Sequence, residues 1–270
     1  TYDLAKLKIQ IKDERKKDVI ASIDKIFSEG VLERGTAGKL KGVLQFVGSQ
    51  MWGKVGRAFL LALSERQYAK DANKAITPEI EAALKVWRHL IVKGRARDLE
   101  VEEDDENDVV IFTDGSWPEP GQNSKPMIGA VVFDKVKGKA WSTAMTVPED
   151  LIREWLPRKT QIAMVEMLAP IVVNEVFKEE LKGRKAILFV DSESVEGALI
   201  KGYSARSDMT WLTAVFWDQL IDLDCLMYID RISTDGNIAD GPSRGRSREA
   251  IAGGWEHREA VIPGAVSGGL

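Results

Sequence analysis

Several features that usually direct a functional interpretation are scarce in this chain of 270 residues. Its one cysteine, Cys225, has no internal partner, which excludes an intramolecular disulfide and fits a reducing intracellular setting, cytoplasmic or nuclear. With one cysteine and two histidines, the chain has no cluster of the ligands that zinc prefers. No apolar run approaches the ~20 residues of a membrane-spanning helix, so we expect no membrane partner.

The overall composition is that of a globular protein, with 44% hydrophobic and 30% charged residues. The length is enough for two domains, each with its own core. No signal-peptide pattern is visible and the first residue is Thr1 rather than methionine, so we expect the chain to be a fragment of a longer protein.

The formal net charge of −4 conceals a strong asymmetry. Residues 1–98 contain 20 Lys and Arg against 12 Asp and Glu, whereas the remaining residues contain 18 against 30. One interpretation is that the first part contacts a polyanion and that the acidic residues of the second part have a function of their own. The other is that both parts have solvated charged faces.

Residues 1–98 have apolar residues at helical spacing, which predicts a small helical domain. Helices are expected over 13–30, 36–52 and 54–67, and a fourth begins where Thr77 can cap it and Pro78 suits its first turn. We expect four aromatic side chains to lie in the core of this domain: Phe46, Trp52, Phe59 and Trp87. Seven acids in the ten positions 99–108 then predict a linker, with a mimic of nucleic acid as the alternative.

From residue 109 the pattern changes to that of an α/β domain over 109–250, followed by a tail over 251–270 rich in glycine and small residues. Five strands are expected, over 109–114, 127–134, 139–147, 185–191 and 225–232. A helix beginning near Thr160 contains Pro170, which predicts a kink. Two further helices are expected over 192–201 and 207–222.

Four carboxylates occupy matching positions in this α/β pattern. Asp114 and Asp191 each end a buried strand, where an unpaired charge is costly unless it holds a cation. Glu166 lies within the apolar stripe of its helix, and Asp240 follows the last strand. Taken singly, Asp114 could cap a turn, Glu166 could pair with a lysine, and the other two could cap helices. We assign the other nearby acids to the surface: Glu193, Glu196, Asp222 and Asp224.

Four acids at one end of one sheet would repel each other unless divalent cations lie among them. All-oxygen ligands suit Mg²⁺, with Mn²⁺ as a substitute, and do not suit zinc. The sequence therefore predicts a magnesium site formed by Asp114, Glu166, Asp191 and Asp240.

The order of these acids, in TDGS, on the first long helix, in FVDSES and in GNIADGPSR, resembles the ribonuclease H superfamily. The last motif resembles the N-x-A-D-x-x-S-R ending of ribonuclease H domains in retroelement reverse transcriptases, especially the DIRS-like and Pao-like groups. The segments ERKKDVIASIDKIF and GKLKGVLQFVGSQ resemble the thumb of such enzymes. Together these matches cover roughly residues 1–250.

The resemblance implies a five-stranded mixed sheet with flanking helices, preceded by a small helical thumb-like domain. It also implies hydrolysis of the RNA strand of an RNA–DNA hybrid by two metal ions held by the four acids. If the chain is a fragment, the polymerase palm and fingers of the same polyprotein would be partners. Recognition of the hybrid would use backbone shape and 2′-hydroxyl groups rather than base sequence.

The chain departs from the family pattern in three ways. The loop RISTDGN lacks the histidine that many members carry before the last aspartate, and His89 and His257 are expected at the surface. The basic helix that some cellular ribonucleases H use to grip the hybrid is missing. There is no Y-x-D-D motif, so this chain alone is not expected to polymerise nucleic acid.

Two competing interpretations remain at this stage. One is a domesticated or structural relic that binds nucleic acid or protein without cutting it. The other is a DNA nuclease or transposase of the same superfamily, which the GNIADGPSR ending disfavours.

Overall fold

The computed structural model describes residues 2–3, 8–71, 73–94, 96–98, 108–119, 121, 124–246 and 248–267. The chain divides into two compact units, residues 1–103 and 104–269, and each is described by itself. Apart from Asp108, the acidic segment that we expected to be a linker, 99–108, lies outside the described residues.

The first unit is mainly helical. In its described part, three two-residue strands pair antiparallel: β1 (Tyr2–Asp3), β2 (Lys8–Ile9) and β3 (Arg97–Asp98). The helices are α1 (Asp13–Glu29), α2 (Arg34–Ser49), α3 (Val55–Ala58), α4 (Leu60–Tyr68) and α5 (Pro78–Lys93). As expected, the hydroxyl of Thr77 accepts a hydrogen bond from the Ile80 N–H at the start of α5. Gly30 ends α1 in the left-handed conformation, with φ of 65°.

Trp87 lies in the first unit's core, where it is 1% exposed. A Cβ atom on Gly56 would lie 2.5 Å from the Trp87 ring, and one on Gly48 would lie 3.0 Å from it. Both glycines therefore let neighbouring backbone pack directly on the indole. Phe59 is also buried, as expected, but the expectation for Phe46 is wrong, because its side chain is 58% exposed.

The second unit contains a six-stranded mixed sheet in the order β8-β7-β4-β5-β6-β9. Its strands are β4 (Val109–Ser116), β5 (Met127–Asp134), β6 (Lys139–Thr146), β7 (Lys185–Val190), β8 (Leu226–Arg231) and β9 (Glu256–His257). β4, β5 and β6 form an antiparallel meander, whereas β7 and β8 run parallel to β4. This arrangement confirms the expected ribonuclease H-like fold class, with the short β9 as a sixth strand beside the five expected.

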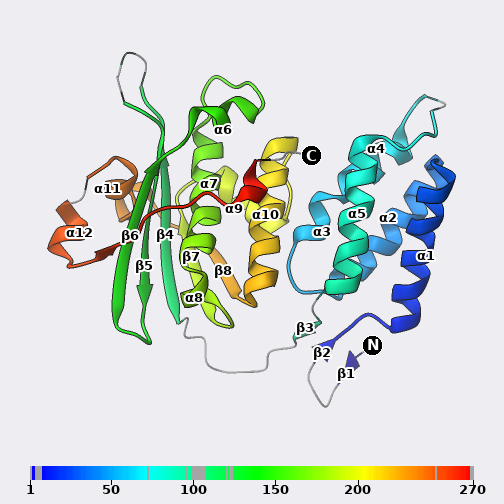
Figure 1. The fold of residues 1–270 in the computed structure, drawn as a ribbon, viewed down its shortest axis with the longest axis horizontal. Coiled ribbons are helices and arrows are strands. Elements are labelled where there is room, and N and C mark those ends of the chain that lie inside the picture. Colours follow the sequence, from blue (N-terminus) through cyan, green and yellow to red (C-terminus); the bar gives the residue numbers. More distant parts are fainter. Residues whose placement is uncertain are drawn as a thin grey trace. The chain divides into compact units, whose positions relative to one another are not determined.

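Helices cover both faces of this sheet (Figure 1). α7 (Ile162–Val176), α9 (Glu193–Lys201) and α10 (Ser207–Leu223) pack together on one face. α11 (Asp240–Ser243) and α12 (Arg248–Ala252) lie on the other, where α11 contacts β4, β5 and β6. The short helices α6 (Glu149–Glu154) and α8 (Lys178–Leu181) complete the connections.

The helix α7 continues through Pro170 to Val176. Because proline lacks an N–H group, the carbonyl of Glu166, four residues earlier, loses its usual helical partner. Amide side chains support the helix beyond this point, since Gln219 on α10 donates a hydrogen bond to the Ile171 carbonyl and accepts one from Asn174.

The segment 251–270, expected to be a tail, contains the end of α12, the strand β9 and the 3-10 turn η2 (Gly264–Val266) among its described residues. Arg258 forms two hydrogen bonds with the Glu180 carboxylate and lies over the rings of Trp141 and Phe177. Val266 is buried. These contacts hold the segment against the second unit through burial, charge and cation–π attraction.

In the described part of the chain, no helix has the length and apolar character needed to span a membrane.

Candidate active site

Two parallel strands bring Asp114 and Asp191 to the same edge of the sheet. Phe112 on β4 pairs with Phe189 on β7, and each of these phenylalanines is followed by an aspartate two residues later. Parallel strands in this register carry both carboxylates to the same level. The pattern that the two strands share, an apolar run ended by an aspartate, therefore brings their two carboxylates together at one edge of the sheet.

Gly115 brings the helix carrying Glu166 up to the end of β4. A Cβ atom at Gly115 would lie 2.6 Å from the Glu166 backbone nitrogen and 2.9 Å from its Cα. Any side chain there would hold α7 away from the strand. The glycine of the TDGS motif is thus the residue that lets Glu166 approach Asp114.

Gly129 lets the backbone of α11 approach the sheet closely on its opposite face. It pairs with Asp114 across β4 and β5, and a Cβ atom there would lie 2.2 Å from the Ser243 backbone nitrogen. Asn237, just before α11, donates a hydrogen bond from Nδ2 to the Thr113 carbonyl and accepts one from the Ala239 N–H. These contacts place Asp240 beside the end of β4.

The four acids form one electrostatic cluster. Burial raises the pKa of Asp114 to about 6, the negative charges of Asp191 and Asp240 contribute to the rise, and hydrogen bonds from Ser243 and Gly115 oppose it. Burial also raises the pKa of Glu166 to about 7, with Asp191 and Asp114 contributing and a hydrogen bond with Ser192 opposing it. The repulsion among these carboxylates is the property that a bound cation would relieve.

The local alternatives for three of these acids find little support in the structure. Asp114 lies within β4, paired with Gly129 and 6% exposed, rather than capping a turn. Glu166 has the Ser192 hydroxyl as a hydrogen-bond partner rather than a lysine. Ser192, not Asp191, is the residue that precedes the first turn of α9.

The chemistry of this group of oxygen ligands fits a hard divalent cation. In the described residues, however, no three Asp, Glu, His or Cys side chains are arranged so that they could hold one ion as they stand. Two carboxylates are turned to other partners: Asp114 Oδ2 accepts a hydrogen bond from Ser243, and Asp240 Oδ1 lies 2.6 Å from Arg244 Nε. Holding one ion between three of these acids would therefore require some of their side chains to change conformation.

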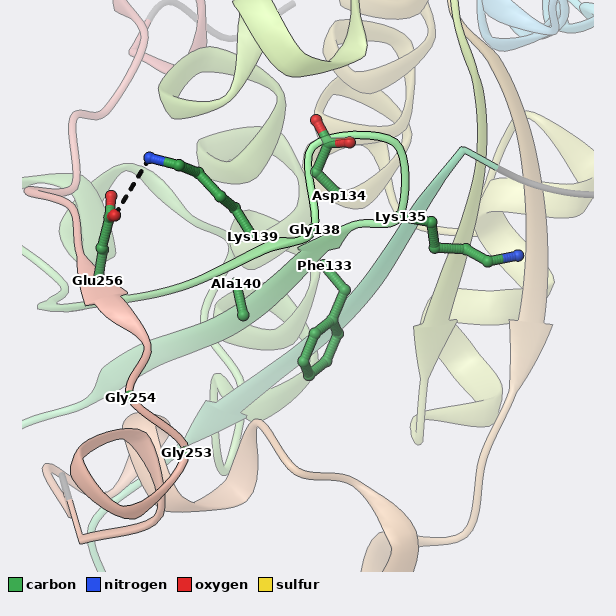
Figure 2. Close-up of a pocket in the computed structure, with 9 residues that line it drawn as sticks. All are labelled: Phe133, Asp134, Lys135, Gly138, Lys139, Ala140, Gly253, Gly254 and Glu256. Carbon is green, nitrogen blue, oxygen red and sulfur yellow. Dashed lines mark hydrogen bonds and ion pairs between the residues drawn. The ribbon is translucent and has the colours of Figure 1, made fainter.

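A hollow of about 450 Å³ lies elsewhere, between the β5–β6 turn and the residues before β9 (Figure 2). Lys139 reaches the Glu256 carboxylate there at 3.2 Å. Its lining residue Asp134 pairs with Val109, at the start of β4, whereas Asp114 lies near the end of that strand. The hollow is therefore separate from the acid cluster.

The sequence analysis did not assign roles to Ser116, Asn237 or Ser243, which hold α11 on β4. Asn237 and Ser243 belong to the GNIADGPSR motif, so the motif itself was the available signal. Both histidines are exposed, as expected. The surface assignment of Glu193 agrees with a side chain that is 82% exposed and paired with Arg231.

The raised pKa of Glu166 predicts that the metal-free protein becomes less stable as the pH rises. Below about pH 4.5 the group is protonated in both the folded and the unfolded chain, because its reference pKa is 4.5. As the pH rises to about 7, the unfolded chain loses this proton first, so stability falls by roughly 3 kcal/mol at most. The Glu166→Gln protein should not lose stability in this way. Denaturant titrations of both proteins in chelator, from pH 4.5 to 8, would measure their free energies of unfolding. If the difference in free energy of unfolding between the two proteins does not change with pH, the raised pKa is not that of Glu166.

Comparison with known proteins gave structural likenesses only. No family model matches the chain, and no curated protein matches it. Ribonuclease H1 from the halophilic archaeon Halobacterium salinarum NRC-1 is similar at 18% identity and a TM-score of 0.37, over 50% of this chain and 92% of that one. LC11-RNase H1, solved in complex with an RNA/DNA hybrid, is similar at 17% identity and a TM-score of 0.39, over 53% of this chain and 99% of that one.

A further likeness covers more of the chain. The foamy viral protease-reverse transcriptase dRH, solved in complex with double-stranded DNA, is similar at 14% identity and a TM-score of 0.29. The match covers 82% of this chain and 35% of that one.

Proposed function

We propose that this chain is the thumb and ribonuclease H part of a retroelement reverse transcriptase, of DIRS-like or Pao-like type, and that it hydrolyses the RNA strand of RNA–DNA hybrids. The observation that carries the proposal is that Asp114, Glu166, Asp191 and Asp240, from four elements of the fold, form one electrostatic cluster around the end of β4. Their order along the chain is the order of the motifs that resemble ribonuclease H.

The four acids would hold two Mg²⁺ ions, with Mn²⁺ as a substitute. When bound, the ions would lower the pKa of the attacking water and stabilise the leaving oxygen. The water oxygen would form a new bond to phosphorus while the bond from phosphorus to the 3′ oxygen breaks, leaving a 5′ phosphate and a 3′ hydroxyl. The contribution of the chain is to hold the carboxylates in place, through Gly115 on α7's side of the sheet and Gly129 on α11's side.

A specific feature of α2 supports a role for the first unit in gripping the hybrid. Gly35, Lys39, Gly42 and Phe46 follow one another at helical spacing and are all exposed, so they share the outer face of the helix. No heavy atom lies within 4 Å of a Cβ atom built on Gly35 or Gly42. A partner can therefore approach the helix backbone closely, with a lysine and an aromatic ring beside it.

Gly42→Ala tests this grip, because its two expected effects have opposite signs. Alanine in an open helical position should stabilise the first unit by roughly 0.5–1 kcal/mol. If nucleic acid lies against this face, the added methyl group should raise the Kd for an RNA–DNA hybrid several-fold. Thermal melting and fluorescence anisotropy with a labelled hybrid measure the two effects. If the variant melts at a higher temperature but binds the hybrid with unchanged Kd, α2 is a solvent-exposed helix that does not contact nucleic acid.

The direct test of the proposed activity is a panel of labelled duplexes incubated with Mg²⁺. We expect cleavage of the RNA strand in an RNA–DNA hybrid and no cleavage of RNA–RNA or DNA–DNA duplexes. Cleavage of DNA–DNA would favour a DNA nuclease or transposase of the same superfamily.

The second candidate function is binding of the hybrid without cleavage, as in a relic of a reverse transcriptase. The pairing of Asp114 with Ser243 and of Asp240 with Arg244 favours it, since both carboxylates are engaged within the protein. Binding of the hybrid without cleavage in the same panel would support this alternative.

A further inference from the structure

Ser243 is a fully buried hydroxyl in direct contact with the acid cluster. It is 0% exposed, and its Oγ donates a hydrogen bond to Asp114 Oδ2. The same oxygen lies 3.0 Å from the Asp240 carbonyl, a second acceptor. A hydroxyl has one hydrogen, and a carboxylate is the stronger acceptor, so the bond to Asp114 is the one we expect to dominate.

The fold fixes Ser243 at this position from several directions. Ser116, two residues after Asp114 on β4, donates a hydrogen bond from Oγ to the Ser243 carbonyl at 2.5 Å. The Ser243 N–H bonds the Ala239 carbonyl at 3.0 Å, within the same turn. Gly129 leaves space for this backbone against β5. Ser243 is therefore held by backbone contacts that do not depend on its own hydroxyl.

We propose that Ser243 is a positioning residue for Asp114, an inference that rests on the proposed function. Its hydrogen bond would restrict rotation of the Asp114 carboxylate and leave the lone pairs of Oδ1 for a divalent cation shared with the other acids. Residues that orient a metal ligand in this way contribute about 10–100-fold to metal affinity or activity.

The test compares Ser243→Ala with a matched control, Ser116→Ala. Both variants remove a buried or half-buried serine hydroxyl at the contact between β4 and α11, but only the Ser243 hydroxyl touches a carboxylate. The readouts are Mn²⁺ affinity of the full chain, by titration calorimetry, and kcat and KM for hybrid cleavage in Mg²⁺. We expect Ser243→Ala to weaken Mn²⁺ binding and to lower kcat, each by about tenfold or more, with KM for the hybrid unchanged. We expect clearly smaller losses in Ser116→Ala than in Ser243→Ala, because Ser116→Ala leaves the Asp114 carboxylate with its donor.

Equal losses in the two serine variants would overturn the inference, since they would show that both hydroxyls only fix α11 to the sheet. Wild-type Mn²⁺ affinity and kcat in Ser243→Ala would also overturn it. If Ser243→Ala does not fold, Ser243→Cys keeps a weak donor of similar shape and should give an intermediate loss. Wild-type affinity and kcat in that variant would count against the inference.

The wild-type protein separates this inference from the proposed function. Wild-type protein that neither binds Mn²⁺ nor cleaves the hybrid would overturn both. Wild-type protein that does both, alongside an unaffected Ser243→Ala, would overturn only the role of Ser243.

Discussion

Asp114→Asn or Asp191→Asn should abolish hybrid cleavage while leaving the fold intact. Asparagine keeps the shape of the side chain but removes a charge that would balance a divalent cation. The expected fall in kcat exceeds the ~10–100-fold typical of residues that only support a metal ligand. Single-turnover cleavage of a labelled hybrid in Mg²⁺ measures it.

The same Asp114→Asn variant should melt at a higher temperature than the wild-type protein in chelator near pH 7.5. Burial raises the pKa of Asp114 to about 6, so at this pH the wild-type protein bears the cost of a buried charge among other acids. Asp235→Asn is a suitable control, because Asp235 is exposed in the loop that leads to Asp240. Full activity in Asp114→Asn or Asp191→Asn, or equal loss in Asp235→Asn, would contradict the assignment.

Glu166→Gln should reduce turnover as severely as the two aspartate substitutions do. It tests the acid whose role is least evident from its position. Glu166 lies on a helix rather than at a strand end, and most residues of α7 around it are buried and apolar. A glutamate with only a structural role there would be replaced by glutamine with stable or improved folding and full activity. A metal ligand would instead give a stable fold with cleavage reduced more than ~100-fold. Mn²⁺ should restore part of the activity, because Mg²⁺ is more demanding of ideal geometry.

Glu193→Gln is the matched control for this experiment. Glu193 lies close in sequence to Asp191, but its side chain is 82% exposed and bonds Arg231 at 2.6 Å. An exposed ion pair of this kind contributes little to stability. Cleavage by Glu193→Gln should therefore match the wild-type rate in both metals. If it is the more damaged of the two variants, the third carboxylate of the site has been placed wrongly.

The elements of the second unit were largely predictable because their sequence patterns are strong. The runs that become β4 and β7 are apolar, β-branched and ended by aspartate, and the structure gives them the expected parallel register. The approach of two helices to Asp114 was not predictable. It depends on Gly115 and Gly129, and no local pattern indicates which backbone a glycine will contact in the folded chain.

The differences between expectation and structure have identifiable physical causes. Phe46 was assigned to the core because aromatic residues are usually buried, yet it falls on the outer face of α2 with Lys39 and Gly42. The strand β9 has two residues, which is too short to show any alternation of side chains. The bond between Arg258 and Glu180 joins residues far apart in sequence, so no local signal predicts that residues 256–267 pack against the second unit.

The central claim is that Asp114, Glu166, Asp191 and Asp240 together hold divalent cations. Anomalous X-ray scattering from crystals of the full chain soaked in Mn²⁺ tests it most directly, because it locates the metal without relying on activity. The account predicts anomalous peaks within coordination distance of these carboxylates, with Asp240 turned from Arg244 toward the ions and Asp114 still bonded to Ser243. Peaks confined to other acids, or none at Mn²⁺ concentrations that support hybrid cleavage, would contradict it.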